Sequence, residues 1–346
     1  MAISEADQIQ FLTNIQRILS EGVFTSTYKF ALLLAFADIC VEHGKDSDDT
    51  LCIRLEEIAD KFVTYYWRQS RPYLGAGNGT ESLLSQNNGQ TPVVIKLLND
   101  LDERPSARPN SLTERRLLRE VQRTIRKMPL VYLQNIGSTR LEFLYDQAAV
   151  GETVVLKAGV MACFRKFYPM VTDLIRGAWI RYIRRKNSDV LGLSNDLDEF
   201  LFGTERASLA GVVPILRDLQ NAECFYCRNP IQGSPHVDHF IPWTRYPLDL
   251  GHNFVLAHNA CNLAKSDMLA AEVHLENWVE RNTRLRPVLE SGFRDQGILF
   301  DLGASNRIAL WAYEQAKQAA SLSWLEKKEL RPISDRWRDL FATSLN

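Results

Sequence analysis

The chain has 346 residues, a length that allows two domains or one large domain with an inserted module. Hydrophobic residues make up 45% of it and charged residues 24%, and the net charge is −1, all ordinary values for a globular protein. The longest apolar run, residues 30–37, is far too short to cross a bilayer, and the first ten residues carry acids where a signal peptide carries bases. These features exclude a membrane-spanning protein, and we expect a cytoplasmic one.

The small net charge conceals an uneven distribution of charge along the chain. Residues 1–103 carry 15 acidic side chains against 8 basic ones, whereas residues 104–186 carry 17 basic side chains against 6 acidic ones. A segment this strongly polarised within a nearly neutral chain suggests a surface that faces a polyanion.

Six cysteines occur in the chain, and three of them belong to a metal motif within residues 224–261. The other three, Cys40, Cys52 and Cys163, are scattered among apolar residues. This pattern predicts buried thiols in a reducing compartment and argues against a disulfide framework.

Two helices are predicted at the N-terminus. Residues 6–20 carry apolar side chains at a helical period. Residues 27–43 are apolar nearly all round, and Gly44 follows them as an end signal. We expect this second helix, capped by Thr25 or Ser26, to lie at the centre of an N-terminal helical core.

A third helix and a long loop follow. Residues 51–66 have an amphipathic helical pattern, and residues 71–92 are rich in Gly, Asn, Ser and Pro, as loops are. The glycines within residues 75–80 could form a phosphate-binding loop, but no predicted strand precedes them and no Lys-Ser/Thr pair follows. Ordinary loop glycines are the favoured interpretation.

Residues 111–128 form the clearest amphipathic helix, and Ser111 with Glu114 matches a capping box. The apolar residues fall within one arc of about 100°, and basic residues gather opposite. Because arginine dominates that face, a phosphate-contacting helix and a solvated outer face are evenly matched alternatives. The candidate nucleic-acid contacts on this face are Arg115, Arg119, Arg123 and Arg126.

The helical periodicity of residues 160–186 predicts a further helix, with basic side chains clustered near its end. Arg184 and Arg185 in this cluster are candidate nucleic-acid contacts. Trp179 and Tyr182 interleave with the basic residues, as aromatic side chains do on some nucleic-acid-binding surfaces. They share an arc with apolar side chains, however, so packing in the core is the favoured role.

The remaining segments carry weaker signals. Residues 131–134 and 153–157 are possible strands, and residues 187–205 contain five acids and no base, which marks a candidate domain boundary. Helical patterns resume at about residues 270–286 and 305–328. The tryptophans expected in the core there are Trp278, Trp311 and Trp324.

Two short pairs of residues frame the most informative stretch of the chain. Cys224 and Cys227 form a C-x2-C pair. After thirty intervening residues, His258 and Cys261 form an H-x2-C pair. Each pair can offer two ligands from one tight turn, and four ligands complete the tetrahedron of a structural zinc site. His236 is an alternative ligand, but its spacing to the C-x2-C pair is poor.

Within this frame lie polar residues that zinc does not need, namely Asp238, His239, Asn253 and Asn262. In order, spacing and residue type the stretch resembles the HNH endonuclease family, whose active unit is a ββα-metal finger. Two residues depart from the family pattern: His258 stands where a cysteine is usual, and Asn262 stands where a histidine often is. Both still suit the metals concerned, because Cys3His binds zinc and an amide oxygen suits a hard cation.

The resemblance implies a role for each residue. His239 would be the general base, Asp238 and Asn262 would hold a catalytic Mg²⁺ or Mn²⁺ ion, and Asn253 would pin the connecting loop. The expected reaction is hydrolysis of DNA phosphodiesters to 5′-phosphate and 3′-hydroxyl ends, with Zn²⁺ as the scaffold. Lys265, about one turn after Asn262, is a candidate phosphate contact, with solvation on the helix surface as the alternative.

We therefore predict a mainly α-helical fold in three parts. Residues 1–200 would form a helical domain with basic, DNA-facing helices. Residues 205–285 would form the HNH nuclease domain with its zinc-containing ββα-metal finger. Residues 286–346 would form a C-terminal helical segment that packs on the rest.

Other functions fit parts of the same pattern. A zinc-stabilised DNA-binding or adaptor protein without catalysis would keep the cysteines and the basic helix but give Asp238 and His239 no role. An RNA-cleaving enzyme with the same type of active site is a third interpretation. The layout also resembles bacterial restriction or anti-phage nucleases, such as the nuclease component of a Zorya-type system, which implies other proteins of a defence system as partners.

Overall fold

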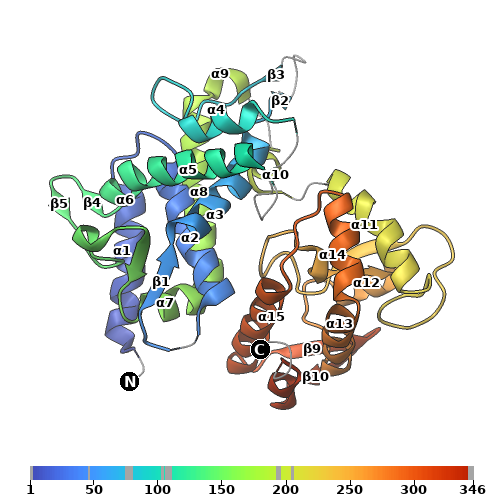
Figure 1. Ribbon diagram of the computed structural model, residues 1–346. Helices are drawn as coiled ribbons and strands as arrows, with labels where there is room; N and C mark the ends of the chain where they lie inside the picture. Colours follow the sequence, from blue (N-terminus) through green and yellow to red (C-terminus); the bar gives the residue numbers. More distant parts are fainter. Residues whose placement is uncertain are drawn as a thin grey trace. The chain divides into compact units, whose positions relative to one another are not determined.

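The computed structural model describes residues 3–45, 47–74, 81–102, 105, 111–191, 196–203 and 206–341. The chain divides into two compact units, residues 1–203 (unit 1) and residues 204–346 (unit 2). The predicted mainly α-helical fold with a small β-hairpin module is confirmed (Figure 1). The loop glycines of residues 75–80 lie outside the described residues. None of the helices described is long and apolar enough to cross a membrane.

Unit 1 contains short two-stranded sheets placed between helices. Its elements in chain order are α1 (Glu5–Glu21), α2 (Tyr28–His43), β1 (Leu51–Arg54), α3 (Leu55–Gln69), β2 (Tyr73–Leu74), β3 (Glu81–Ser82), α4 (Val93–Asn99), α5 (Leu112–Lys127), α6 (Pro129–Tyr132), β4 (Asn135–Ile136), β5 (Thr139–Arg140), η1 (Gln147–Ala149), β6 (Thr153–Leu156), α7 (Val160–Lys166), α8 (Tyr168–Lys186), α9 (Ser188–Leu191) and α10 (Leu197–Phe202).

The core of unit 1 is built around α2. This helix packs against α3, α6, α7 and α8, and every residue from Tyr28 to Glu42 is buried (Figure 1). A helix that is apolar all round is stable only when neighbours cover each of its faces, which is the arrangement found here. Its predicted central position and its end at Gly44 are both confirmed.

The start of α2 differs from the prediction. Thr27, and not Thr25 or Ser26, is the N-cap residue, and it makes no side-chain cap hydrogen bond. Its hydroxyl instead lies 2.7 Å from the Tyr66 hydroxyl and donates to the Gln86 side-chain oxygen at 3.0 Å. The tertiary partners of this buried hydroxyl therefore replace the local cap.

Three charged groups within the core of unit 1, those of Asp38, Glu42 and Lys61, have direct partners. Asp38 accepts hydrogen bonds from Tyr65 at 2.6 Å and from Tyr168 at 2.7 Å, and burial raises the pKa of this carboxyl. Lys61 on α3 contacts Glu42 on α2 at 2.5 Å. Because buried polar groups are costly unless they are paired, these contacts fix the register of α2 against α3 and α8.

The predicted helix over residues 51–66 is wrong at its start. Leu51–Arg54 form β1, which pairs antiparallel with β6, so that Cys52 lies opposite Val155. The helix then begins at Leu55. Four residues with alternating burial find a strand partner about a hundred residues later in the chain, and this distant pairing overrides the local helical pattern.

Two further short segments were predicted as strands. The strand over residues 153–157 is confirmed as β6. The strand over residues 131–134 is wrong, because residues 129–132 form the single helical turn α6. Pro129 occupies the first helical position, where its missing N–H is not needed.

The cysteines of unit 1 differ in exposure. Cys40 and Cys163 are buried as predicted, and burial raises the pKa of Cys163 to about 11. Cys52 is exposed, contrary to the prediction, because alternate residues of β1 face opposite sides of the strand. The two buried thiols are therefore packing groups with little thiolate character.

Unit 2 carries the cysteine-rich segment. Its elements in chain order are α11 (Arg206–Leu219), β7 (His236–His239), η2 (Gly251–Asn253), β8 (Phe254–Ala257), α12 (Asn259–Lys265), α13 (Glu272–Arg284), α14 (Arg286–Asp295), α15 (Leu302–Gln318), β9 (Leu322–Glu326), β10 (Glu329–Pro332) and η3 (Arg336–Phe341).

The C-terminal helix is shorter than the predicted span of residues 305–328. It ends at Gln318, and residues 322–332 form the hairpin β9–β10. Lys327 adopts a positive φ of 48° at the turn between the two strands. Trp324 is buried as expected, but it projects from a strand and not from a helix.

Candidate metal centre and active site

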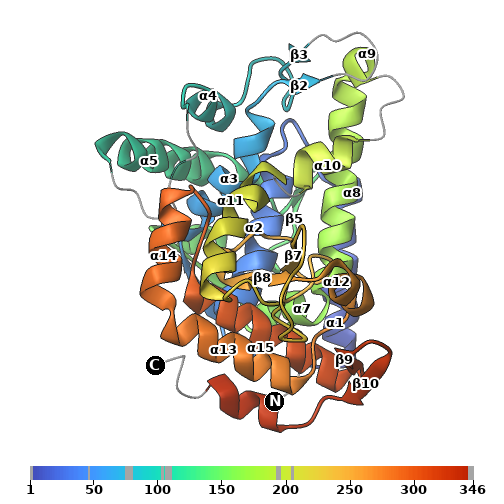
Figure 2. The same cartoon turned by 90° about the vertical axis from the view of Figure 1, so that its right-hand side faces the viewer.

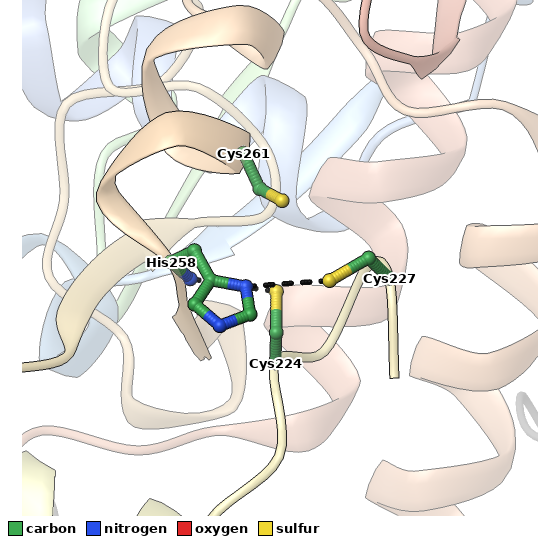
Figure 3. A group of neighbouring side chains, drawn as sticks. All are labelled: Cys224, Cys227, His258 and Cys261. Atoms are coloured by element: carbon green, nitrogen blue, oxygen red, sulfur yellow. Dashed lines mark hydrogen bonds between the residues drawn. The ribbon is translucent and has the colours of Figure 1, made fainter. Parts of the chain in front are cut away.

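The four residues of the two predicted pairs meet in space. One potential ligand atom from each of Cys224, Cys227, His258 and Cys261 lies within 4.8 Å of all the others (Figure 3). The first two come from the turn after α11, where the Arg228 amide donates to the Cys224 carbonyl at 3.0 Å. The other two come from the start of α12. The group thus joins two segments that the β7–β8 hairpin separates in the chain.

His258 is oriented so that one ring nitrogen faces the thiols. Its Nδ1 lies 3.3 Å from the Cys227 sulfur, and its Nε2 lies 3.2 Å from the Pro230 carbonyl oxygen. A histidine that binds a metal through one nitrogen commonly donates from the other to a carbonyl, which fixes the ring. The alternative ligand His236 is not part of the group, and it is exposed on β7.

The donor set fits a structural zinc ion. Burial, together with the neighbouring Cys224 and Cys227, raises the pKa of Cys261 to about 12. Thiols packed this closely do not ionise together unless a cation offsets their charges. Three thiolates and one neutral imidazole are among the standard ligand sets of structural Zn²⁺, for which all four positions are filled by protein.

The hairpin that carries Asp238 and His239 is held along both strands. Asp238 pairs with Val255, and His239 pairs with Phe254 across the two strands. On its other edge β8 exchanges hydrogen bonds with the side chain of Gln220, at 2.9 Å in each direction through the backbone of Leu256. All four residues of β8 are buried. The position of the hairpin is therefore set by backbone pairing as well as by packing.

A buried arginine fastens the segment before β8 to α13. Arg281 donates to the Phe254 carbonyl at 2.8 Å and to the His252 carbonyl at 2.9 Å, and Asn282 donates to the His252 carbonyl at 3.0 Å. Burial lowers the pKa of Arg281 to about 9. These bonds satisfy carbonyls that no sheet neighbour reaches, and they hold the end of the connecting loop in place.

Asp238 is buried and has two close partners. The Tyr226 hydroxyl donates to its Oδ2 at 2.5 Å, and the Lys265 ammonium lies 3.1 Å from the same oxygen. Lys265 also donates to the His239 carbonyl at 3.0 Å and is fully buried, and burial lowers the pKa of its ammonium. The alternative of a solvated surface position for Lys265 is wrong, because the side chain is fully buried. The phosphate contact by Lys265 stays a prediction.

His239 contacts a carboxylate that lies outside the predicted set of site residues. Its Nε2 lies 2.7 Å from Oδ1 of Asp249, and the rings of Phe254 and Trp243 flank it at 5.0 and 5.4 Å. An ionised carboxylate only accepts hydrogen bonds, so this pair places a proton on Nε2. In the neutral ring Nδ1 is then the nitrogen with a free lone pair.

The two asparagines of the motif lie in different surroundings. The Asn253 side chain accepts from the Ile241 amide at 2.8 Å and donates to the Ile241 carbonyl at 2.9 Å, so it bridges β8 to the loop after β7. Asn262 is half-buried on α12, and its side chain makes no hydrogen bond to any described residue. Its amide oxygen is thus available as a ligand.

The Asp238 carboxylate has acceptor capacity beyond its two partners. A carboxylate has about four lone-pair positions, and the Tyr226 hydroxyl and the Lys265 ammonium occupy the nearer ones, with a longer contact of 3.4 Å from Lys265 to Oδ1. A hard cation such as Mg²⁺ prefers oxygen ligands and keeps several waters. The carboxylate of Asp238 and the amide oxygen of Asn262 fit that preference.

The predicted DNA contacts on unit 1 lie at its surface. Arg115 and Arg119 are exposed on α5, and Arg184 and Arg185 are exposed at the end of α8. Figure 2 shows the two helices, α5 and α8, that carry them. The capping box that starts α5 is confirmed.

Two arginines of α5 have acidic neighbours. Arg123 pairs with Glu120 at 2.8 Å, and Arg126 pairs with Glu152 at 2.5 Å. The basic face of α5 is therefore partly neutralised at Arg123 and Arg126, whereas Arg115 and Arg119 nearer its N-terminus make no ion pair with a described residue.

The contacts that Tyr226, Asp249 and Lys265 make around the site were not predicted from the sequence. Tyr226 lies between two zinc ligands, where a hydroxyl near the active site could have been expected. Asp249 and Lys265 lie within the motif stretch, but spacing alone does not indicate which charged residue turns toward which neighbour.

Replacing one thiol should test the zinc site. We expect Cys261→Ser to lower the zinc content from about one ion per chain toward zero, since structural sites need all four ligands, and to make unit 2 sensitive to proteases. Elemental analysis by mass spectrometry and limited proteolysis measure the two effects. Cys52→Ser, which changes an exposed cysteine of unit 1, is the matched control and should keep its zinc. Full zinc content in Cys261→Ser would contradict the assignment.

Two family models match the chain. The model of a domain of unknown function (DUF8808) matches residues 8–195, more than half of the chain, and the model of the HNH endonuclease matches residues 224–268. The second match contains the Cys3His group and the hairpin with Asp238 and His239. Neither a curated protein nor a solved structure matched the chain. The chain therefore belongs to the family defined by the domain of unknown function DUF8808, and it carries an HNH endonuclease domain in unit 2.

Proposed function

We propose that the protein is a metal-dependent endonuclease that hydrolyses phosphodiester bonds in DNA. The observation that carries this proposal is the side-by-side placement of Asp238 and His239 on β7, each held by its own partner, within the stretch that matches the HNH endonuclease. A zinc-stabilised binding protein would need neither a held histidine nor a buried carboxylate with an open position. Neither family description names a defence system, so the proposal does not extend to anti-phage defence or restriction.

In this proposal His239 acts as the general base. Asp249 holds the proton on Nε2, so Nδ1 takes a proton from the attacking water. Phe254 and Trp243 limit the rotation of the imidazole ring, and the pairing of β7 with β8 fixes the backbone of His239. The ring therefore needs no reorganisation before it accepts a proton.

Asp238 and Asn262 would hold the divalent ion, which when bound neutralises charge that develops on the scissile phosphate. Tyr226 and Lys265 hold the Asp238 carboxylate in a fixed orientation. Asn253, the last residue of η2 directly before β8, holds the loop after β7 in place through its two hydrogen bonds to Ile241.

DNA would also contact the exposed arginines of unit 1. Arg115 and Arg119 make no ion pair with any described residue, in contrast to Arg123 and Arg126. Exposed guanidinium groups bind phosphates without reading the base sequence and give binding a strong dependence on salt. Arg185 at the end of α8 supplies a further exposed cation.

Plasmid cleavage is the first test of the proposed reaction. Wild-type protein should cleave supercoiled plasmid when Mg²⁺ or Mn²⁺ is present, and His239→Ala should lower the rate by about 10²- to 10⁴-fold, the usual contribution of a general base. The zinc content of the variant should equal that of the wild type. Equal cleavage by both proteins would show that His239 is not the base, and cleavage without any added divalent ion would contradict the proposed metal dependence.

Removing the carboxylate behind His239 should slow catalysis without weakening DNA binding. We expect Asp249→Ala to lower kcat by about 10- to 100-fold, as is typical when the partner of a functional histidine is removed. Asp249→Asn should retain part of the activity, because its amide oxygen can still accept the bond from Nε2. Single-turnover cleavage and DNA affinity are measured in parallel, with Asp295→Ala, an exposed carboxylate of α14, as control. An unchanged kcat in Asp249→Ala would show that Asp249 does not contribute to catalysis.

Charge reversal on α5 should weaken binding to DNA of any sequence. In the His239→Ala background, which prevents cleavage, Arg115→Glu and Arg119→Glu should each reduce the slope of log K against log salt by about one unit for each phosphate that the variant no longer binds. Fluorescence anisotropy over a range of salt concentrations gives the slope. Arg17→Glu on α1 makes the same change of charge outside the basic face and should have little effect. An equal drop in affinity in all three variants would indicate a nonspecific effect of net charge.

A further inference from the structure

A cavity in unit 1 lies beside the first turn of α2, and none of the residues assigned to zinc, catalysis or DNA lines it. Its volume is about 360 Å³, and its walls include Tyr28 and Lys29 on one side and Met128 and Tyr132 on the other. Small-molecule sites in proteins commonly have volumes of roughly 300–1,000 Å³. The cavity therefore has room for a small ligand.

Lys29 in this wall is a buried cation without an anionic partner. Its side chain is only 8% exposed, and its ammonium makes no hydrogen bond or ion pair to any residue in the described part of the chain. The nearest compensating group is the ring of Phe24, whose centroid lies 5.5 Å away. Burial lowers the pKa of Lys29 to about 8, with no carboxylate to oppose the shift.

The other buried cations of the described residues all have acceptors. Lys61 and Lys265 face the carboxylates of Glu42 and Asp238, and both buried arginines donate to backbone carbonyls. Because an isolated buried charge is costly, an ammonium that is left without an acceptor indicates a position that a ligand completes. Lys29 is the exception, and it lines a cavity.

The N-terminus of α2 adds to the positive potential at this wall. Thr27, its N-cap residue, makes no side-chain cap hydrogen bond, because its hydroxyl is engaged by Tyr66 and Gln86. The first amides of this 16-residue helix thus lack a side-chain acceptor, and Ser26 and Tyr28 of the same segment line the cavity. A helix N-terminus favours an anion, and here the unpaired ammonium of Lys29, a residue that is 8% exposed, belongs to the same helical turn.

The cavity also has large apolar side chains that are exposed to solvent. Val23, Met128 and Tyr132 line it, and they are 63%, 47% and 48% exposed respectively. Large apolar side chains left open around a concave site commonly contact the nonpolar part of a ligand. An aromatic or other ring-bearing body would cover these side chains.

We propose that this cavity binds a small molecule that carries one anionic group on a ring-bearing body. Lys29 and the N-terminus of α2 would hold the anionic group, a phosphate or a carboxylate. Met128 and Tyr132 would contact the body. The site is independent of the proposed nuclease activity, so binding can be measured whether or not the protein cleaves DNA.

The dye 8-anilinonaphthalene-1-sulfonate has the proposed chemistry, since it carries one anionic group on aromatic rings. With the full chain we expect a saturable fluorescence increase with one site per chain. Lys29→Met should weaken the affinity at least about tenfold, because the charge-assisted bond to the anionic group can no longer form. Lys166→Met is the matched control, because Lys166 also lies beside a phenylalanine ring, at 5.6 Å, but does not line the cavity.

An uncharged dye separates removal of the charge from collapse of the cavity. N-phenyl-1-naphthylamine should bind the wild type and Lys29→Met equally, which shows that the cavity persists in the variant. Displacement of the anionic dye by adenosine 5′-monophosphate or by indole-3-acetate then distinguishes a phosphate from a carboxylate ligand. Equal affinity of the anionic dye for wild type and Lys29→Met, or displacement by neither competitor, would overturn the proposal.

Discussion

The Cys3His group is the constraint on which the geometry of unit 2 depends. It joins the turn after α11 to the start of α12, while the β7–β8 hairpin lies between these segments in the chain. Tyr226 lies inside the same turn and donates to Asp238, so the residues that supply Cys224 and Cys227 also hold the carboxylate. Packed thiols repel one another once ionised, so a cation is needed to keep the turn and helix together. A zinc ion held by this group would thus be linked to Asp238 through Tyr226, in addition to the contact of Asp238 with Lys265 and the pairing of β7 with β8.

Burial of charge around Asp238 has two opposing consequences. An isolated carboxylate would cost several kcal/mol in the protein interior, and the adjacent Lys265 ammonium offsets that cost. The same ammonium would repel a divalent ion that shares the carboxylate, so the residue that compensates the charge of Asp238 also weakens its affinity for a second cation. An ion held mainly by Asp238 and by the neutral amide of Asn262 would therefore bind with modest strength and would depend on the DNA phosphate for further ligands.

Local features of the sequence predicted the parts of the site that depend on spacing. The two ligand pairs each lie within one turn, and the apolar face of α5 follows from the helical period, so both were accessible without a structure. Asp249, which contacts His239, lies ten residues after it in an irregular loop. No periodicity in the sequence indicates where such a loop turns. Lys265 lies on a helix of only seven residues, too short for its pattern to show that this face is buried. Likewise β1 forms only because β6 supplies a distant partner.

The use of Lys265 inside unit 2 bears on how the protein would hold DNA. A single small module buries roughly 600–1,000 Å² of its surface on DNA, and affinity at that size relies on phosphate contacts. With Lys265 engaged by Asp238, fewer cations of the HNH domain are free to meet phosphates. The proposed affinity then has to come from other parts of the chain. The exposed arginines near the start of α5, Arg115 and Arg119, meet that requirement, because they make no ion pair with any described residue. The opposite face of this helix is buried in the core of unit 1, so the helix holds them in place.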